Sequence, residues 1–123
     1  MSNKIQSPNS KRIYDLKERT SKFGENIIKF AKCITDNLIN RPLISQLVRA
    51  STSIGANYME ADGAESKKDF QHKIAICKKE SKETLYWLQM IATANSATRN
   101  ECRKFWQEAH ELTLIFSSIL LKK

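Results

Sequence analysis

The chain has 123 residues, which corresponds to a single domain with a workable hydrophobic core. Its 21 Lys and Arg outnumber its 13 Asp and Glu, and the formal net charge of +8 is enough to attract a polyanion or an anionic surface. The longest apolar-rich run, residues 112–121, is far shorter than the ~20 residues that cross a bilayer, and residues 1–10 lack the apolar core of a signal peptide. We therefore expect a cytoplasmic protein without membrane contact, with residues 1–10 as a disordered N-terminal tail.

The three cysteines, Cys33, Cys77 and Cys102, are dispersed and form no C-x-x-C pair. This spacing indicates neither a zinc knuckle nor a redox motif. We interpret them as reduced thiols in the protein core, in keeping with a cytosolic protein.

The first predicted helix covers residues 13–38, where apolar or small residues recur at intervals of mostly three and four. The stripe consists of Ile13, Leu16, Thr20, Phe23, Ile27, Phe30, Ile34 and Leu38. Gly24 interrupts this helix at a cost of about 1 kcal/mol relative to Ala. It marks either a close contact with another helix or a tolerated flaw.

Pro42 marks the start of the second helix, because proline fits the first helical turn. Its stripe is Ile44, Leu47, Ser51, Ile54, Tyr58 and Ala61. Gly63 then lies where a left-handed helix stop is expected. The segment also contains a run of small residues, which predicts that another helix approaches closely: Ala50, Ser51, Ser53, Gly55 and Ala56.

Two capping patterns predict where the third and fourth helices begin. Ser66 with Asp69 resembles a capping box and opens a stripe of Phe70, Ile74, Cys77, Ser81, Thr84, Leu88 and Ile91. Thr98 with Glu101 forms a clearer box and opens a stripe of Cys102, Phe105, Ala109, Leu112, Phe116 and Ile119, widened by Trp106, Ile115 and Leu120.

Four helical stripes with short connections and no strand alternation predict an all-α protein, an antiparallel up-down-up-down four-helix bundle over residues 11–123. Ile76, Trp87 and Met90 lie off the main stripe of the third helix. They either widen the core or, together with the apolar end of the fourth helix, form a subunit interface.

Three segments resemble the family named after the 23S rRNA intervening-sequence protein. They are Arg49-Ala-Ser-Thr-Ser-Ile-Gly-Ala-Asn57, Glu60-Ala-Asp-Gly63 and Ser66-Lys-Lys-Asp-Phe70, within a similarity that runs from Ile13 to about Leu120. The resemblance implies a small antiparallel bundle that assembles into a ring, a homopentamer, with no known enzymatic activity. A related accessory protein of diversity-generating retroelements is similar in fold and ring assembly and binds nucleic acid, but this relation is one of fold alone.

With 100° of rotation per residue, most lysines of the third helix lie on one arc of its circumference. Asp69, Glu80 and Glu83 lie on another sector. The candidate nucleic-acid-binding residues are Lys67, Lys68, Lys78, Lys79, Lys82 and Tyr86, extended by Arg99, Arg103 and Lys104 of the fourth helix. The last three oppose the helix dipole, which an anionic partner would relieve. The alternative is an ordinary solvated lysine face.

The second helix has a small polar side with Ser53, Asn57 and Glu60, and Arg49 nearby. Either this side is exposed to solvent, or it packs against a neighbouring subunit with Arg49 and Glu60 in paired charges. Together with Ile76, Trp87 and Met90, these residues form the candidate oligomer interface.

No catalytic or metal constellation is recognisable in the sequence. Only Asp69-x-x-His72 and Gln107-x-x-His110 approach the di-metal pattern of helical bundles, and Gln is a poor substitute for a bridging carboxylate. Both histidines are expected at the surface, and no cofactor is expected. With no nucleophile set between a base and an orienting acid, the sequence predicts a protein that is not an enzyme.

Two functional hypotheses follow. The first is a ring-forming bundle that binds RNA or DNA without strong sequence preference through the lysines of the third helix, with affinity raised by repetition around the ring. The second is an oligomeric scaffold for another protein, in which the lysines serve only solubility.

Overall fold

The computed structural model describes residues 8–122, with side chains from residue 16 onward. It contains the helices α1 (Pro8–Lys32), α2 (Asn40–Asp62), α3 (Lys67–Ala94) and α4 (Arg99–Leu121), and a short 3₁₀ turn, η1 (Ser96–Thr98). No strand occurs within this part of the chain. Residues 1–7 of the expected tail lie outside the described residues, and α1 begins at Pro8.

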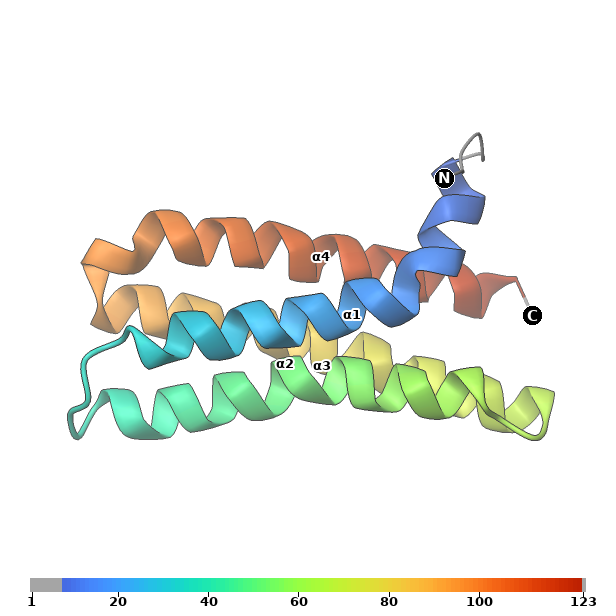
Figure 1. The fold of residues 1–123 in the computed structure, drawn as a ribbon, viewed down its shortest axis with the longest axis horizontal. Coiled ribbons are helices and arrows are strands. Elements are labelled where there is room, and N and C mark those ends of the chain that lie inside the picture. Colours follow the sequence, from blue (N-terminus) through green and yellow to red (C-terminus); the bar gives the residue numbers. More distant parts are fainter. Residues whose placement is uncertain (1–7, 123) are drawn as a thin grey trace.

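Successive helices run in opposite directions, as Figure 1 shows, so that sequential neighbours are antiparallel. This confirms the predicted all-α bundle. The backbones pack closely between α1 and α2, between α2 and α3, and between α3 and α4, whereas α1 and α4 lie farther apart and meet through long side chains such as Phe23, Phe30 and Phe105. The bundle is therefore closed on three sides and partly open on the fourth.

The core is built from the predicted stripes. Its fully buried side chains include Leu16, Ile27, Leu47, Ile54, Ile74, Leu88, Ile91, Leu112 and Phe116. Ser51, Ser81 and Thr84 of the same stripes are also buried. The Ser81 and Thr84 hydroxyls donate to the carbonyls of Cys77 and Glu80, one turn earlier, so neither leaves an unpaired donor in the core.

The first helix is shorter than predicted, because it ends at Lys32 instead of continuing to Leu38. The side chain of Leu38 is 81% exposed. Asn37 explains the break: its carboxamide oxygen accepts a hydrogen bond of 2.8 Å from the backbone N–H of Asn40, and its carbonyl accepts one of 3.0 Å from the N–H of Arg41. These bonds stabilise a turn that starts α2 at Asn40, two residues before Pro42.

The predicted helix ends were partly wrong. Gly63 follows α2 as expected, but its φ of −102° is not left-handed. Ser66 caps α3 as predicted, since its hydroxyl accepts a 3.0 Å hydrogen bond from the N–H of Asp69. Thr98 makes no such bond to α4, because its hydroxyl donates instead to the carbonyl of Asn95 in the preceding turn.

The helices α1 and α2 approach each other closely where both carry glycine. A Cβ atom on Gly55 would lie 3.4 Å from the carbonyl oxygen of Thr20, and one on Gly24 would lie 3.5 Å from the side chain of Thr52. The run of small residues thus admits a neighbouring helix, as predicted, and Gly24 marks a close contact.

A pair of asparagines joins the two connections at one end of the bundle. The carboxamides of Asn40 and Asn95 exchange hydrogen bonds of 3.0 and 2.9 Å, and Asn40 also donates to the carbonyl of Thr35 at 2.8 Å. Asn40 is 1% exposed. Because a buried carboxamide is costly when unpaired, this exchange ties the α1–α2 connection to the end of α3.

We predict that Gly55→Leu destabilises the fold by about 1–3 kcal/mol, because the added side chain has no room against the backbone of Thr20. Urea unfolding measures the change. Gly63→Ala is the control: its Cβ would make only one ordinary van der Waals contact, 3.9 Å from the carbonyl oxygen of Met59, and we expect a change within about 0.5 kcal/mol. Equal effects of the two substitutions would contradict the close approach of α1 and α2.

We predict that Asn95→Ala costs about 1–3 kcal/mol of unfolding free energy, because it leaves the buried carboxamide oxygen of Asn40 without its donor. Thermal unfolding followed by circular dichroism measures the loss. Asn100→Ala serves as the control, since Asn100 is exposed and its side chain makes no hydrogen bond within the described residues. A stability loss no larger than that of the control would show that the asparagine pair is dispensable.

Candidate nucleic-acid interface

The lysines predicted to bind nucleic acid lie on the surface of α3. Lys67, Lys68, Lys79 and Lys82 are exposed, and Lys78 is half-buried. None of the five has an ion-pair partner among the described residues. The remaining lysine of α3, Lys73, pairs with Glu60 of α2 at 2.6 Å.

Arg49 holds two of the three acidic residues of α3 on the side that faces α2. Its guanidinium pairs with Glu80 at 3.2 Å and with Glu83, and the indole N–H of Trp87 donates to Glu83 at 3.0 Å. Glu80 is 8% exposed, so its carboxylate needs this partner. Two of the three acids of α3 are thereby paired with a cation of α2, which leaves the lysines of α3 as its main unpaired charges within the described residues.

The same contacts bear on the candidate oligomer interface. Arg49 and Glu60 are both paired within the chain, so these charges need no partner from another subunit. The Ser53 hydroxyl donates to the carbonyl of Arg49, and the Asn57 carboxamide donates to the carbonyl of Ser53. Subunit contact at this side remains a prediction that rests on the family resemblance.

Trp87 packs against the hydrophobic core, whereas Ile76 and Met90 are half-buried beside it. Trp87 also supports Tyr86, whose ring contacts it edge-on with centroids 4.9 Å apart. The Tyr86 side chain is 53% exposed, so it is available to a ligand on the lysine side of α3.

A groove of about 420 Å³ lies between α3 and the first half of α4. Its lining consists of Leu88, Gln89, Ala92, Arg99, Cys102, Arg103, Trp106 and Gln107. The lining holds two arginines and no acidic residue, and neither arginine has an ion-pair partner among the described residues. This groove extends the positive surface of α3 onto α4.

Trp106 is the groove residue whose role the sequence did not reveal. We expected it to widen the core, but it is 38% exposed and lines the groove, and its ring stacks on that of His110 with centroids 5.1 Å apart and an interplanar angle of 18°. Its position in the sequence could have indicated this. Trp106 comes directly after Phe105 of the core stripe, so it points away from the core centre, and it lies one turn after Arg103.

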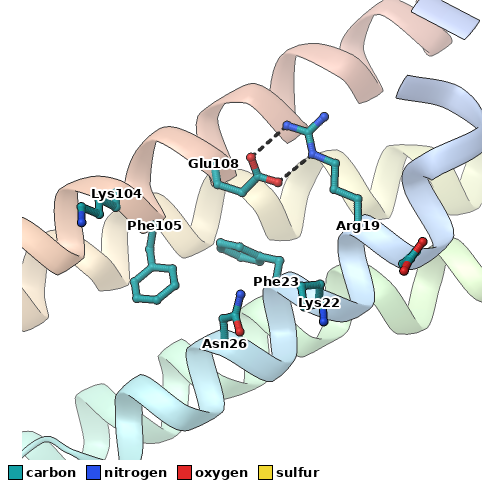
Figure 2. A pocket seen from close by; sticks show the side chains of 8 residues that line it. Arg19, Lys22, Phe23, Asn26, Lys104, Phe105 and Glu108 are labelled. Atoms are coloured by element: carbon teal, nitrogen blue, oxygen red, sulfur yellow. Dashed lines mark hydrogen bonds and ion pairs between the residues drawn. The ribbon is translucent and has the colours of Figure 1, made fainter. Parts of the chain in front are cut away.

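Lys104 does not belong with Arg99 and Arg103. It lines a different groove, of about 460 Å³, between α4 and α1. Figure 2 shows this groove with the rings of Phe23 and Phe105 between the two helices. The structure therefore separates one of the three predicted cations of α4 from the other two, because adjacent positions on a helix point in different directions.

The α1–α4 groove also contains acidic groups, Glu18 and Glu108. Arg19 of α1 binds Glu108 of α4 through two hydrogen bonds of 2.7 and 2.9 Å, the dashed lines in Figure 2, and it also pairs with Glu111. These hydrogen bonds raise the pKa of the Arg19 guanidinium. The carboxylates make this groove a poorer site for a polyanion than the α3–α4 groove.

Histidine and cysteine positions were predicted in part. His72 and His110 are exposed, as expected, and no three His, Cys, Asp or Glu side chains of the described residues gather in a way that would hold a metal ion. Cys77 and Cys102 are buried, as expected, but the prediction of a core thiol was wrong for Cys33, which is exposed just after the end of the first helix. Among the described helices, none is long and apolar enough to span a membrane.

The fold and this surface define an open, antiparallel four-helix bundle with a basic side. The chain belongs to the 23S rRNA-intervening sequence protein family, whose model matches residues 12–118. The resemblance of the second and third helices to this family is thereby confirmed.

The structure is similar to a crystal structure of a Bacteroides thetaiotaomicron protein from the S23 ribosomal protein family, described as a protein with unknown function. The two chains are 31% identical, with a TM-score of 0.74, over 85% of this chain and 97% of the other. No curated protein matches the chain.

We predict that a maleimide at pH 8 labels Cys33 quickly and Cys77 and Cys102 slowly. Burial raises the pKa of the Cys77 thiol to about 12 and raises that of Cys102, which lowers the fraction of reactive thiolate at pH 8. We expect Cys77 to react at least about a hundredfold more slowly than Cys33. Intact-mass spectrometry over time measures the rates, and urea should equalise them. Rapid labelling of all three cysteines in the folded protein would contradict the burial of Cys77 and Cys102.

Proposed function

We propose that the protein is a non-enzymatic, self-assembling cytoplasmic bundle that binds RNA or DNA through the basic surface of α3 and the start of α4, without strong sequence preference. The main observation in support of this proposal is the separation of positive and negative side chains on α3. Five of its lysines form no ion pair with any residue that the structure describes, while Glu80 and Glu83 are held by Arg49 on the side facing α2.

Free lysines and arginines at a surface can neutralise phosphates and release the counterions that surround a nucleic acid. Such binding depends on the phosphate backbone and is largely independent of base sequence. Arg99 and Arg103 support the proposal, because cations in the first turns of a helix oppose its dipole and gain from a nearby anion. The net charge of +8 supplies long-range attraction of the same sign.

Self-assembly rests on the family resemblance, which implies a homopentameric ring, and on the half-buried apolar side chains Ile76 and Met90. A ring would present the basic surface several times to one strand. Repeated weak contacts would then give a much higher overall affinity than a single copy. The expected mass in solution is five times that of the 14.2 kDa chain.

A scaffold for another protein is the second candidate function. It is favoured by Leu38 and Ile39, which are 81% and 62% exposed in the connection between α1 and α2. Two adjacent apolar side chains that project into solvent gain from being covered by a partner. In this case the lysines of α3 would have no ligand.

We predict that replacing Lys78, Lys79 and Lys82 by Glu weakens binding to a single-stranded RNA by tenfold or more and lowers the salt slope, log Kd against log salt, by about two to three. The control variant carries Glu in place of three exposed lysines of α1: Lys17, Lys29 and Lys32. Both variants therefore have the same net charge. Fluorescence anisotropy of nuclease-treated protein across a salt series measures both quantities, with the oligomer mass recorded on each sample.

An equal loss in the two variants would show that only net charge matters and would contradict a binding surface on α3. Absence of binding by the unmodified protein, even at low salt, would refute nucleic-acid binding and favour the scaffold. A monomer at the protein concentrations used would refute self-assembly.

A further inference from the structure

We infer that the α3–α4 groove is a site for one unpaired nucleobase of a single strand, stacked on Trp106, with the adjoining phosphates held by Arg99 and Arg103. This inference rests on the proposed function and adds to it a binding site for a base. It predicts that the protein prefers single strands to duplexes, which the lysines of α3 do not by themselves explain.

The groove combines an aromatic wall with an apolar floor. Leu88 and Cys102 at its floor are 1% and 3% exposed, while Trp106 at its edge is 38% exposed. A flat, exposed indole beside a hollow of about 420 Å³ suits a planar ring, and this volume lies within the range of small-ligand sites. Stacking of a base on an aromatic side chain tolerates any base, because every base has a π face.

His110 supports the indole from outside the groove. Its ring lies almost parallel to that of Trp106, at an interplanar angle of 18° and a centroid distance of 5.1 Å, yet it is not part of the groove lining. One face of the indole is therefore covered by His110, and the surface that Trp106 gives to the groove remains open. His110 thus fixes the orientation of the indole that a base in the groove would contact.

The polar groups of the groove match the other parts of a nucleotide. The carboxamides of Gln89 and Gln107 each offer donors and an acceptor to the edge of a base, and neither makes a side-chain hydrogen bond within the described residues. Arg99 and Arg103 lie in the first turns of α4, where the helix dipole also favours an anion. With no acidic residue in the lining, phosphate meets no like charge there.

A paired base does not fit this arrangement. Within a duplex the base is stacked on both faces and its Watson–Crick edge is occupied, so entering the groove would require unstacking and unpairing, at a cost of a few kcal/mol. An unpaired base avoids most of that cost. The groove thus distinguishes single strands from duplexes without reading their sequence.

The experiment compares two strands of equal length and charge, an oligouridine and the same backbone with abasic residues, by fluorescence anisotropy at one salt concentration. We expect the native protein to bind the strand with bases about tenfold or more tightly than the abasic strand. Trp106→Ala should remove this difference by weakening only the strand with bases, and Trp106→Phe should restore part of it.

Tyr86→Ala tests the other exposed aromatic residue near the lysines, which lies outside the groove, and it should lower the ratio less than Trp106→Ala does. Leu114→Ala is the control, since Leu114 is an exposed apolar residue of α4 outside the groove, and it should leave the ratio between the two strands unchanged. As a second readout, Trp87→Phe leaves Trp106 as the sole tryptophan of the chain, and its fluorescence should be quenched on addition of the strand with bases.

Equal affinity for the two strands, with steep salt dependence, would overturn the base site and leave the proposed function standing. Loss of the ratio in Tyr86→Ala and not in Trp106→Ala would also overturn it, by moving the stacking site to α3. Absence of binding to either strand at low salt would instead overturn the proposed function itself.

Discussion

The close approach of α1 to α2 is the constraint on which the rest of the structure depends. Gly55 allows the backbone of Thr20 to lie within van der Waals contact, and Gly24 does the same for Thr52. A helix held so near one neighbour lies farther from the other, so the backbones of α1 and α4 are more widely spaced and leave a groove bridged by Arg19 and Glu108. As a result α4 packs chiefly on α3, and the surface formed by these two helices carries the candidate site.

Electrostatic order on α3 follows from one residue of α2. Arg49 gathers Glu80 and Glu83, and Trp87 donates to the second of these carboxylates. Without a cation there, the nearly buried Glu80 would be destabilising. The pairing also removes negative charge from the neighbourhood of the lysines. One contact thus serves the stability of the α2–α3 packing and keeps the opposite side of α3 positive.

Family membership and the candidate site provide different kinds of knowledge. The match over residues 12–118 and the 31% identical structure establish the family and its fold. They do not indicate an activity for this chain, since the solved relative is itself described as having unknown function. The proposals therefore rest on the chemistry of named side chains: unpaired lysines, a groove without acids, and an indole supported by a histidine.

The sequence by itself determined the four helices, their antiparallel order and most of the core, because the spacing of apolar residues follows directly from 3.6 residues per turn. It also indicated the lysine face and a close contact at Gly55, and it left Gly24 as either a close contact or a tolerated flaw. It failed where a local hydrogen bond competed with the periodicity, as at Asn37 and Thr98. The separation of Lys104 from Arg103 was also readable from the sequence, because adjacent positions on a helix point in different directions. Only the tertiary structure decided that Trp106 lines a groove, because the packing of neighbouring helices determines which side of α4 remains open.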